Sequence, residues 1–351
     1  MTNKIFFFRY FRKVKLNMKI KYNISLKPYN TFGIDVKANK FIEINSIEEL
    51  ISVTKNKKDF FLLGGGSNIL LTQDIENTVL YINIKGIKII KENKYSVYVE
   101  VNAGENWHEF VLWNLKKKFG GIENLSLIPG NVGTCPVQYI GAYGVEVKDT
   151  IYKVNTIEIA TGKKVYFNNK DCNFAYRNSI FKNEVKDKYI ITSVVFRLTK
   201  IKHKLKYNYG VIQNEFNLNG IEKPTIQDVS KAIIKIRKTK LPDPKELGNS
   251  GSFFKNPVVD KEVFLKIQKE NEKMPFYQVG EQYKIPAGWL IEKSGFKGKR
   301  LGDAGVHKNQ ALVLVNYDNA TGNDILELAK KIQNKVKKLF YINLEMEVNI
   351  F

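Results

Sequence analysis

GNSGSFFKNP, residues 248–257, is the stretch around which the rest of the chain is organised. Its glycines allow backbone conformations that other residues avoid, so the loop can approach a ligand closely. Ser252 stands between the flexible part of the loop and two phenylalanines, and Lys255 and Asn256 carry groups that bind anions or carbonyls. Upstream, KLPDP begins at Lys240 and reaches the loop through two stiff prolines. Taken alone, the stretch fits a ligand-binding loop and a plain surface loop equally well.

The length of 351 residues allows two or three compact units with a sizeable core. Cys135 and Cys172 form neither a disulfide framework nor a paired metal-ligand spacing, which predicts a reducing compartment, the cytoplasm, and no metal site. No apolar run is long enough to span a bilayer. Residues 1–16 are basic and aromatic and lack a small-residue cleavage site, so a secretory signal is not expected. We expect residues 1–17 to be an unstructured extension, with Met18 as an alternative start.

The net charge of +22 at pH 7 raises the question of nucleic-acid binding. The charge is spread along the whole chain, and it accompanies an excess of lysine, asparagine and isoleucine rather than arginine. This composition is typical of an AT-rich genome. Because no nucleic-acid recognition motif accompanies the charge, we do not expect a nucleic-acid partner, although a phosphate-bearing ligand would still favour local basic residues.

A first glycine cluster, GGGSN, occupies residues 64–68 directly after the apolar stretch FFLL. It differs from the dinucleotide-binding fingerprint because Ile69 stands where the third glycine belongs, and because more strand, rather than a helix, is predicted to follow. A strand–glycine–strand turn with Ser67 and Asn68 can form a nest of backbone N–H donors for a phosphate. A tight turn without a ligand is the alternative.

A second cluster runs from LIPGNVGT, residues 127–134, to QYIGAYG, residues 138–144. Four glycines fall within fifteen residues here and are mixed with apolar residues. This density favours backbone packed against a large ligand, with a series of structural turns as the alternative.

A single arginine, Arg177, lies among aromatic residues in CNFAYRNSIFK, residues 172–182. An arginine in this setting is either part of a packed ion pair or a clamp for an anion. The residues alone do not choose between the two.

Helix and strand patterns alternate along the chain without an internal repeat. Helices are predicted where apolar residues recur at helical spacing or a capping box begins a segment, namely over residues 46–55, 107–118, 226–238, 261–272 and 321–336. Strands are predicted for apolar runs and alternating segments, namely residues 41–44, 60–63, 95–101, 154–159, 165–167, 189–198, 310–316 and 344–351.

Eleven segments resemble the UDP-N-acetylenolpyruvoylglucosamine reductase family and occur in that family's order. They cover nearly everything from about residue 24 to the C-terminus, and they read NTFGID, GGGSN, AGENWHEFV, ENLSLIPGNVG, IGAYGVE, YRNSIFK, KLPDPK, GNSGSFFKNPVV, AGWLIE, HKNQALVLVN and LEMEV. The additional YNYG segment, residues 207–210, resembles the longer, enterobacterial-type branch.

The resemblance implies an α+β chain with an FAD-binding fold of the vanillyl-alcohol-oxidase (PCMH-type) class. Two FAD-binding subdomains would be followed by a separate α+β substrate-binding domain. The implied limits are residues 18–90 and 91–225 for the two subdomains, 226–338 for the substrate-binding domain, and 339–351 for a C-terminal strand that returns to the active site.

The implied activity is that of UDP-N-acetylmuramate dehydrogenase, a step of peptidoglycan and cell-wall synthesis. NADPH would reduce a non-covalently bound FAD, and the enolpyruvyl group of UDP-N-acetylglucosamine enolpyruvate would be reduced to UDP-N-acetylmuramate. NADPH and the sugar nucleotide would use one pocket in turn. We expect a cytoplasmic monomer that binds no nucleic acid and does not insert into a membrane.

The resemblance also implies roles for individual residues. Ser252 matches the proton donor, Arg177 the group that stabilises the enolate-like intermediate, and Glu347 its protonated partner. Lys240 is a candidate for offsetting the developing Ser252 alkoxide.

Further residues match positions that hold the cofactor and the substrate. Those expected to hold FAD are Gly64, Gly65, Gly66, Ser67, Asn68, Pro129, Gly130, Gly133, Thr134, Ile140, Gly141, Ala142, Gly144, Tyr176 and Arg237. Those expected to hold the substrate are Tyr143, Tyr209, Lys240, Asn256, Tyr277, Lys284 and Gln310.

One departure from the family pattern is Asn349, which stands two residues after Glu347 where an arginine is usual. A contact to the flavin is therefore lost or replaced by another basic residue. The rival interpretation, an FAD-dependent oxidase of the same fold with another small substrate, accounts for both glycine clusters but leaves the Ser252 loop unexplained.

Overall fold

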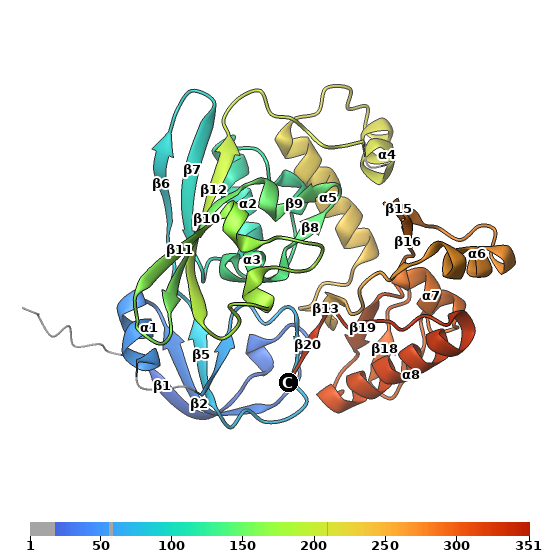
Figure 1. The fold of residues 1–351 in the computed structure, drawn as a ribbon, viewed down its shortest axis with the longest axis horizontal. Helices are drawn as coiled ribbons and strands as arrows, with labels where there is room; N and C mark the ends of the chain where they lie inside the picture. Colours follow the sequence, from blue (N-terminus) through green and yellow to red (C-terminus); the bar gives the residue numbers. More distant parts are fainter. Residues whose placement is uncertain (1–17, 56–58, 209) are drawn as a thin grey trace, which may run out of the picture.

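The computed structural model describes residues 18–55, 59–208 and 210–351. The expected extension, residues 1–17, and the predicted substrate-binding residue Tyr209 lie outside the described residues. Within the described chain, three larger sheets and their helices follow one another along the sequence (Figure 1).

The first sheet has the strand order β1-β2-β5-β3, with β1 antiparallel to β2 and the other pairs parallel. Its strands are β1 (Ile20–Ser25), β2 (Lys37–Ile44), β5 (Thr78–Ile82) and β3 (Phe60–Leu63). Helix α1 (Ile47–Thr54) begins as predicted, because the Ser46 hydroxyl accepts from the Glu49 N–H at 3.1 Å. The first glycine cluster leads from β3 into the short strand β4 (Ile69–Leu70).

The second sheet is antiparallel throughout, in the order β11-β10-β12-β7-β6. Its strands are β11 (Lys164–Asn168), β10 (Ile151–Glu158), β12 (Tyr189–Thr199), β7 (Ser96–Asn102) and β6 (Ile87–Glu92). Helix α2 (Trp107–Lys116) buries Trp107 and Phe110 against Phe196 of β12, with ring centroids 5.0–5.9 Å apart. The short elements α3 (Cys135–Gln138), β8 (Gly141–Ala142) and β9 (Val145–Glu146) come from the second glycine cluster.

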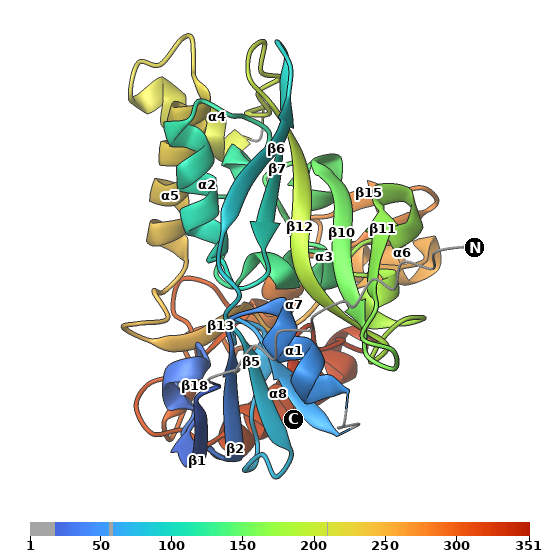
Figure 2. The same ribbon diagram turned by 90° about the vertical axis from the view of Figure 1, so that its left-hand side faces the viewer.

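Helix α5 (Ile226–Lys240) packs on this second part of the molecule, although the predicted limits group it with the substrate-binding domain. Figures 1 and 2 show α2 between α5 and the second sheet. Gln227 Nε2 donates to the Leu115 carbonyl at 3.0 Å, and Ser230 Oγ lies 2.8 Å from Ser126 Oγ. Helix α4 (Gly210–Leu218) packs on α5 through a small apolar cluster that includes Phe216. The apolar stripe of α5 predicts that the helix is buried, but it does not identify the partner, and the domain limits remain a proposal.

The third sheet has the order β13-β19-β18-β17 and packs with the last helices. Its elements are β13 (Gly248–Ser252), β19 (Val313–Asn316), β18 (Ala304–Val306), β17 (Arg300–Leu301), α7 (Ala287–Lys293) and α8 (Gly322–Phe340). The predicted apolar face of α8 is confirmed, because Ile325, Leu328, Ile332 and Val336 are all buried. A smaller sheet beside it consists of β14 (Val258–Val259), β16 (Gln282–Lys284) and β15 (Tyr277–Val279), next to α6 (Lys261–Glu270).

The C-terminal segment connects the third sheet to the first part of the chain. The predicted strand 344–351 is regular only in β20 (Asn349–Ile350), which pairs in parallel with β4. The preceding residues follow the loop after β13 instead, where the Glu347 N–H donates to the Phe253 carbonyl at 2.8 Å. Strand β19 is also shorter than predicted, because Val313 closes a turn onto Gln310 before the strand begins.

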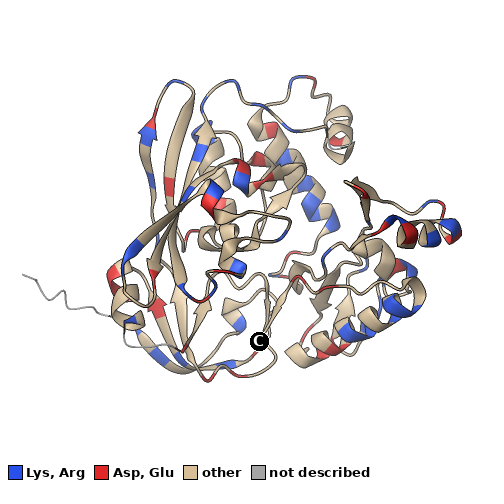
Figure 3. Cartoon of the chain, in the orientation of Figure 1, with Lys and Arg blue, Asp and Glu red and all other residues tan. Residues whose placement is uncertain are grey.

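Two properties concern the described chain as a whole. None of its helices is both long and apolar enough to cross a membrane. Lysine and arginine occur on elements of all three parts of the molecule (Figure 3). The positive charge is therefore distributed over the fold, as its distribution along the sequence indicates.

Candidate functional site

A two-residue turn carries Arg177. Ala175 and Asn178 exchange both of their backbone hydrogen bonds, at 2.8 and 3.1 Å, so Tyr176 and Arg177 form the tip. Arg177 has φ = 54°, in the left-handed region that side chains other than those of Gly, Asn and Asp rarely adopt. A positive φ at this place is typical of the second central position of a type II turn.

The Arg177 side chain connects two distant segments. Its Nε lies 2.7 Å from Glu347 Oε1, and both side chains are mostly buried. Its Nη1 donates to the Tyr139 carbonyl at 3.3 Å. Of the two interpretations left open by the sequence, the ion pair is present. The role of Arg177 as an anion clamp remains a proposal.

Burial raises the pKa of the Glu347 carboxyl above its usual range, and the nearby cations Arg177, Lys182 and Lys255 oppose this shift. Glu347 therefore retains its proton at a higher pH than an exposed glutamate does. The carboxylic acid form can donate a hydrogen bond, which the ionised form cannot.

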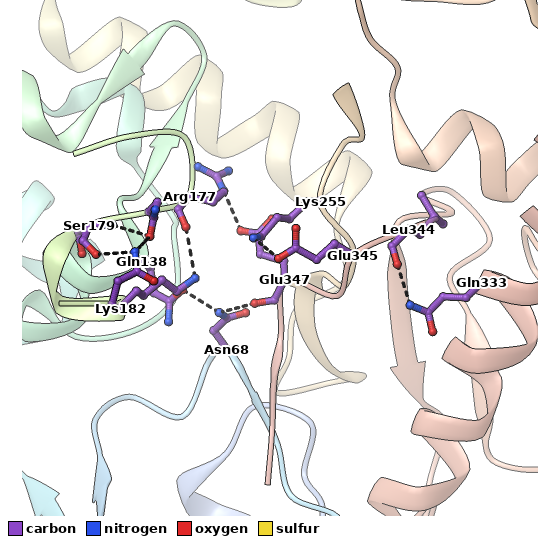
Figure 4. A network of polar contacts seen from close by, with 12 residues as sticks. Asn68, Gln138, Arg177, Ser179, Lys182, Lys255, Gln333, Leu344, Glu345 and Glu347 are labelled. Carbon is purple, nitrogen blue, oxygen red and sulfur yellow. Dashed lines mark hydrogen bonds and ion pairs between the residues drawn. The ribbon is translucent and has the colours of Figure 1, made fainter. Parts of the chain in front are cut away.

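Ser252 ends β13 and is exposed. It pairs with Val313 after an irregularity in the sheet, next to Gly251 at φ = 72°. The neighbouring carbonyl, that of Phe253, accepts the Glu347 N–H. Three segments that are far apart in the sequence therefore meet here: the turn with Arg177, the end of β13 and the C-terminal segment. Figure 4 shows Arg177 and Glu347 facing each other across this junction.

A cavity of about 1040 Å³ opens beside the Arg177 turn. The predicted cofactor residues that line it are Gly64, Gly65, Gly66, Ser67, Asn68, Gly133, Thr134 and Tyr176, together with Arg177. Among the described residues, the predicted cofactor residues that do not line it are Pro129, Gly130, Ile140, Gly141, Ala142, Gly144 and Arg237.

The two glycine clusters pack on each other at one side of this cavity. A Cβ atom on Gly65 would lie 2.8 Å from the Gly130 Cα, and one on Gly130 would lie 2.7 Å from Ser67 Oγ. The Gly65 distance is to backbone and leaves no room for a side chain, and Gly130 has φ = 111°, which residues with a side chain rarely adopt. Glycine is therefore favoured at both positions where the loops cross. Close packing of backbone on backbone therefore explains part of the glycine density that the sequence suggested was due to a ligand.

Two predicted substrate-binding residues of the third part of the molecule, Lys284 and Asn256, interact with the Arg177 turn, and a third, Tyr277, lies beside Lys284. Lys284 Nζ lies 4.7 Å from the Tyr176 ring centroid, and Tyr277 is the cross-strand neighbour of Lys284. Burial raises the pKa of the Tyr176 phenol, and hydrogen bonds with Asn256 are among the effects that lower it. Asn256 Oδ1 also accepts from the Ala287 N–H at 2.9 Å.

Other predicted residues lie in different surroundings. Burial lowers the pKa of the Arg237 guanidinium, and the neighbouring Tyr143 opposes this shift. Lys240 ends α5, and among the hydrogen bonds and ion pairs of the described residues none joins it to Ser252. Gln310 accepts from the Leu312 N–H at 3.4 Å in the turn before β19.

Two lysines line the cavity, of which Lys255 was predicted from the sequence to bind an anion or a carbonyl and Lys182 was assigned no role. Lys182 Nζ donates to the Arg177 carbonyl at 3.3 Å, and Lys255 forms an ion pair with Glu345. Burial lowers the pKa of Lys182, and the charge of Lys255 lowers it further. Lys182 belongs to the YRNSIFK segment and Lys255 to the SFFKN segment. The sequence signal for their functional importance was therefore their closeness along the chain to Arg177 and Ser252. Their convergence depends on tertiary structure.

Asn349, which stands where the resemblance predicts an arginine, anchors the first glycine cluster. Its Nδ2 donates to the Asn68 carbonyl at 2.9 Å, and its backbone N–H donates to the same oxygen at 3.2 Å. The Asn68 side chain in turn donates to Gln138 Oε1 at 3.0 Å and to the Glu347 carbonyl at 3.2 Å (Figure 4). The asparagine therefore holds the cavity wall rather than extending a charge into the cavity.

Two protein-family models match the chain. An FAD-binding domain matches residues 38–167, and the C-terminal domain of UDP-N-acetylenolpyruvoylglucosamine reductase matches residues 243–351. A reductase of that name from Flavobacterium johnsoniae is 59% identical over 336 residues, which cover 95% of this chain and 100% of the relative. The chain belongs to the UDP-N-acetylenolpyruvoylglucosamine reductase family. A relative of the same name from Pseudomonas fluorescens is 45% identical, over 96% of this chain and 100% of the relative.

Structural similarity agrees with this family. The crystal structure of UDP-N-acetylenolpyruvylglucosamine reductase from Thermus caldophilus superimposes with a TM-score of 0.68 at 22% identity, covering 95% of this chain and 99% of that chain. The predicted family, the α+β fold with FAD-binding subdomains and the FAD-dependent oxidoreductase class are confirmed. The matched C-terminal model includes the Ser252 loop, which the rival oxidase interpretation leaves unexplained.

The residues at the cavity fit FAD. A volume of about 1040 Å³ is at the upper end of the roughly 300–1,000 Å³ found for small-molecule sites, as a dinucleotide requires. Gly64 to Asn68 bring backbone to the cavity wall, and Lys182, Lys186 and Lys255 provide positive charge for a diphosphate.

Proposed function

We propose that the chain catalyses the NADPH-dependent reduction of UDP-N-acetylglucosamine enolpyruvate to UDP-N-acetylmuramate, with Ser252, Arg177 and Glu347 as catalytic residues. The observation that supports this best is the Arg177–Glu347 ion pair at 2.7 Å, next to the strand end that carries Ser252 and beside the cavity. As a member of this reductase family, the chain acts in peptidoglycan synthesis.

FAD would be held by the residues of the first glycine cluster together with Gly133, Thr134 and Tyr176, which line the cavity. When bound, FAD supplies the hydride that it takes from NADPH. Lys182 and Lys186, which also line the cavity, would supply positive charge to hold this anionic cofactor. The predicted cofactor residues outside the cavity lining, such as Gly130, would support the loops that hold FAD rather than line its pocket.

Arg177 would bind the carboxylate of the enolpyruvyl group. When the terminal carbon of the double bond accepts hydride, negative charge spreads onto this carboxylate in an enolate-like form. A guanidinium presents parallel N–H donors to a carboxylate, and fixed donors stabilise charge that develops in a transition state. Glu347 in its protonated form would add a further hydrogen bond to the same group.

Ser252 would protonate the carbon next to the carboxylate, which completes the lactyl ether. Its hydroxyl is exposed, so the resulting alkoxide can regain a proton from solvent. A serine hydroxyl is a weak acid in water and needs a local cation or donor to act. Lys240 as that cation remains a prediction, because no hydrogen bond or ion pair with Ser252 is present among the described residues.

The remaining predicted contacts belong to the sugar nucleotide. Asn256, Tyr277 and Lys284 lie next to the Tyr176–Arg177 turn and would bind the substrate's diphosphate and sugar. Tyr143, Lys240, Gln310 and Tyr209 are proposed on the family resemblance alone. We further propose that NADPH and the substrate share one pocket in turn, and that the protein acts as a cytoplasmic monomer.

The Ser252→Ala variant tests this assignment by separating the two half-reactions. We expect NADPH to bleach the flavin of Ser252→Ala at the wild-type rate, whereas product formation falls by about 10²–10⁴-fold, the usual contribution of a general acid. Stopped-flow absorbance of the flavin measures both steps without oxygen.

Ser250→Ala is the matched control, because this nearby hydroxyl is buried and forms no hydrogen bond with a described residue. It should leave both half-reactions unchanged. Equal losses in both half-reactions of Ser252→Ala would instead make Ser252 a structural residue.

A further inference from the structure

Two series of polar contacts connect the end of helix α3 to Glu347. In one series, Gln138 Oε1 accepts from the Asn68 side chain, which also donates to the Glu347 carbonyl. In the other, the Tyr139 carbonyl accepts from Arg177, whose Nε pairs with the Glu347 carboxylate. Figure 4 shows Asn68, Gln138, Arg177 and Glu347 in this arrangement. Gln138 is thus connected through Asn68 to the main chain of Glu347, and the adjacent Tyr139 is connected through Arg177 to its side chain.

The backbone of Tyr139 has an unusual conformation at this point. Its φ and ψ are 48° and 65°, left-handed values that end α3 after Gln138. A residue with a Cβ atom persists in this region only where its surroundings hold it there, and such positions concentrate at functional sites. The conformation determines the direction of the Tyr139 carbonyl, which is the group that contacts Arg177.

The Tyr139 side chain is held on all sides and is almost completely buried. Its ring stacks on Phe174 with centroids 5.4 Å apart, and its hydroxyl donates to Glu146 Oε2 at 2.5 Å. Lys148 Nζ lies 3.1 Å from that carboxylate and 5.5 Å from the ring centroid. These contacts stabilise the left-handed backbone.

The same end of α3 also holds both sides of the Arg177 turn. Phe174, which stacks on Tyr139, precedes the turn. Ser179, which follows the turn, donates to the Val137 carbonyl at 3.3 Å. The position of the turn relative to α3 is therefore fixed independently of the Arg177 side chain, so that the contact to the Tyr139 carbonyl orients the guanidinium itself.

We propose that Tyr139 is a positioning residue for Arg177, and that its left-handed backbone aims a carbonyl oxygen at one edge of the guanidinium. Nη1 donates one hydrogen to the Tyr139 carbonyl, and Nε lies 2.7 Å from Glu347 Oε1 in an ion pair without a hydrogen bond. The second Nη1 hydrogen and both Nη2 hydrogens therefore remain for a substrate carboxylate. The carbonyl thereby selects which edge of Arg177 is offered to the substrate. This inference rests on the proposed catalytic role of Arg177.

A pair of substitutions at residue 139 separates the backbone effect from loss of the ring. Tyr139→Asn and Tyr139→Val both remove the stacking and the hydroxyl, but asparagine tolerates the left-handed region whereas a β-branched residue does not. Both are compared as the flavin-containing enzyme. The readouts are the reduction of flavin by NADPH and its anaerobic reoxidation by the enolpyruvyl sugar nucleotide.

We expect Tyr139→Val to be reoxidised at least about tenfold more slowly than Tyr139→Asn, a difference of about 1.4 kcal/mol in activation free energy. Reduction by NADPH should agree within about twofold in both variants, because it does not use Arg177. Equal reoxidation rates in the two variants would overturn the inference and assign Tyr139 a packing role only.

A third variant covers the case in which Tyr139→Val retains no flavin. Alanine is disfavoured in the left-handed region less than valine but more than asparagine. The reoxidation rate of Tyr139→Ala should therefore fall below that of Tyr139→Asn. An alanine rate equal to or above the asparagine rate would contradict the proposal. Failure of the wild-type enzyme to be reoxidised at all would instead contradict the proposed function, so the two failures are distinguishable.

Discussion

Arg177 combines an unfavourable backbone with a buried ion pair. A non-glycine residue in the left-handed region costs roughly 1–2 kcal/mol of free energy. The contacts of the Arg177 side chain with the Tyr139 carbonyl and Glu347 offset this cost. The family resemblance predicts Arg177, Glu347 and Ser252 as catalytic residues, and the structure brings their three segments together. The resemblance did not reveal the left-handed backbone or the contacts of Tyr139, Lys182 and Lys255, because these arise only when distant segments pack together.

The raised pKa of Glu347 predicts the direction of a pH dependence. If the protonated acid donates a hydrogen bond to the intermediate, flavin reoxidation is fast below this raised pKa and slows as the pH rises through it. Glutamine is a permanent donor without a proton to lose. Glu347→Gln should therefore remove this pH limb while slowing reoxidation by no more than about tenfold, less than the loss of a whole donor.

The measurement is the rate of anaerobic reoxidation across a pH series, with the NADPH half-reaction as the internal control. A limb that persists unchanged in Glu347→Gln would show that another group titrates. A wild-type rate that increases with pH would contradict the protonated role of Glu347.

At the scale of single elements, local signals predicted several helices and strands closely, such as residues 60–63 for β3 and 189–198 for β12, but they failed at the end of the chain. Helix α8 begins at the predicted capping box, where Thr321 Oγ1 accepts from the Asp324 N–H at 3.2 Å. The segment 344–351 alternates like a strand, yet only Asn349 and Ile350 form one, because its neighbours pair irregularly with the loop after β13. Helix signals are local, whereas strand pairing depends on a distant partner.

The α8 cap predicts a stability effect without an effect on chemistry. Thr321→Ala removes the hydroxyl that caps the helix, which should lower the free energy of unfolding by about 0.5–2 kcal/mol. Lys335→Ala, on the exposed side of the same helix, should change it by no more than about 0.5 kcal/mol. Urea denaturation provides both values, and an unchanged midpoint for Thr321→Ala would contradict the capping role.

Strand β20 predicts an effect on cofactor affinity. Asn349→Ala removes the 2.9 Å side-chain bond to Asn68, which holds the glycine cluster at the cavity. Loss of one such bond costs about 0.5–1.5 kcal/mol, so the dissociation constant of FAD should rise by about two- to tenfold.

Asn323→Ala is the comparison variant, because it removes a similar amide-to-carbonyl bond, to Thr72, at an exposed position that does not line the cavity. The release of flavin on dilution measures the dissociation constant of FAD for each of the two variants. Equal affinities in the two variants would show that Asn349 does not support the cofactor site.

At the scale of the whole molecule, the cavity is lined by segments from every part of the fold. The glycine cluster, the Arg177 turn, Lys255 from the loop after β13 and the C-terminal segment all line it. Motif order was enough to predict the fold class and the family. The packing of α5 on the second sheet's helices was not predicted, because an apolar stripe does not specify what covers it.

The net charge of +22 is a property of the whole chain rather than of the site. Lysine and arginine occur on all three parts of the fold, so the charge alone does not identify a binding surface (Figure 3). Lys182 and Lys255 are among the basic residues that line the cavity, and the proposed function depends on such local charges rather than on the net charge.

The central claim is that residues far apart in the sequence converge on an FAD site and reduce an enolpyruvyl sugar nucleotide. The most direct test follows the flavin absorbance of the purified protein without oxygen. We predict a yellow protein that is bleached by NADPH and regains its colour when UDP-N-acetylglucosamine enolpyruvate is added. A protein that stays bleached after this addition would contradict the account.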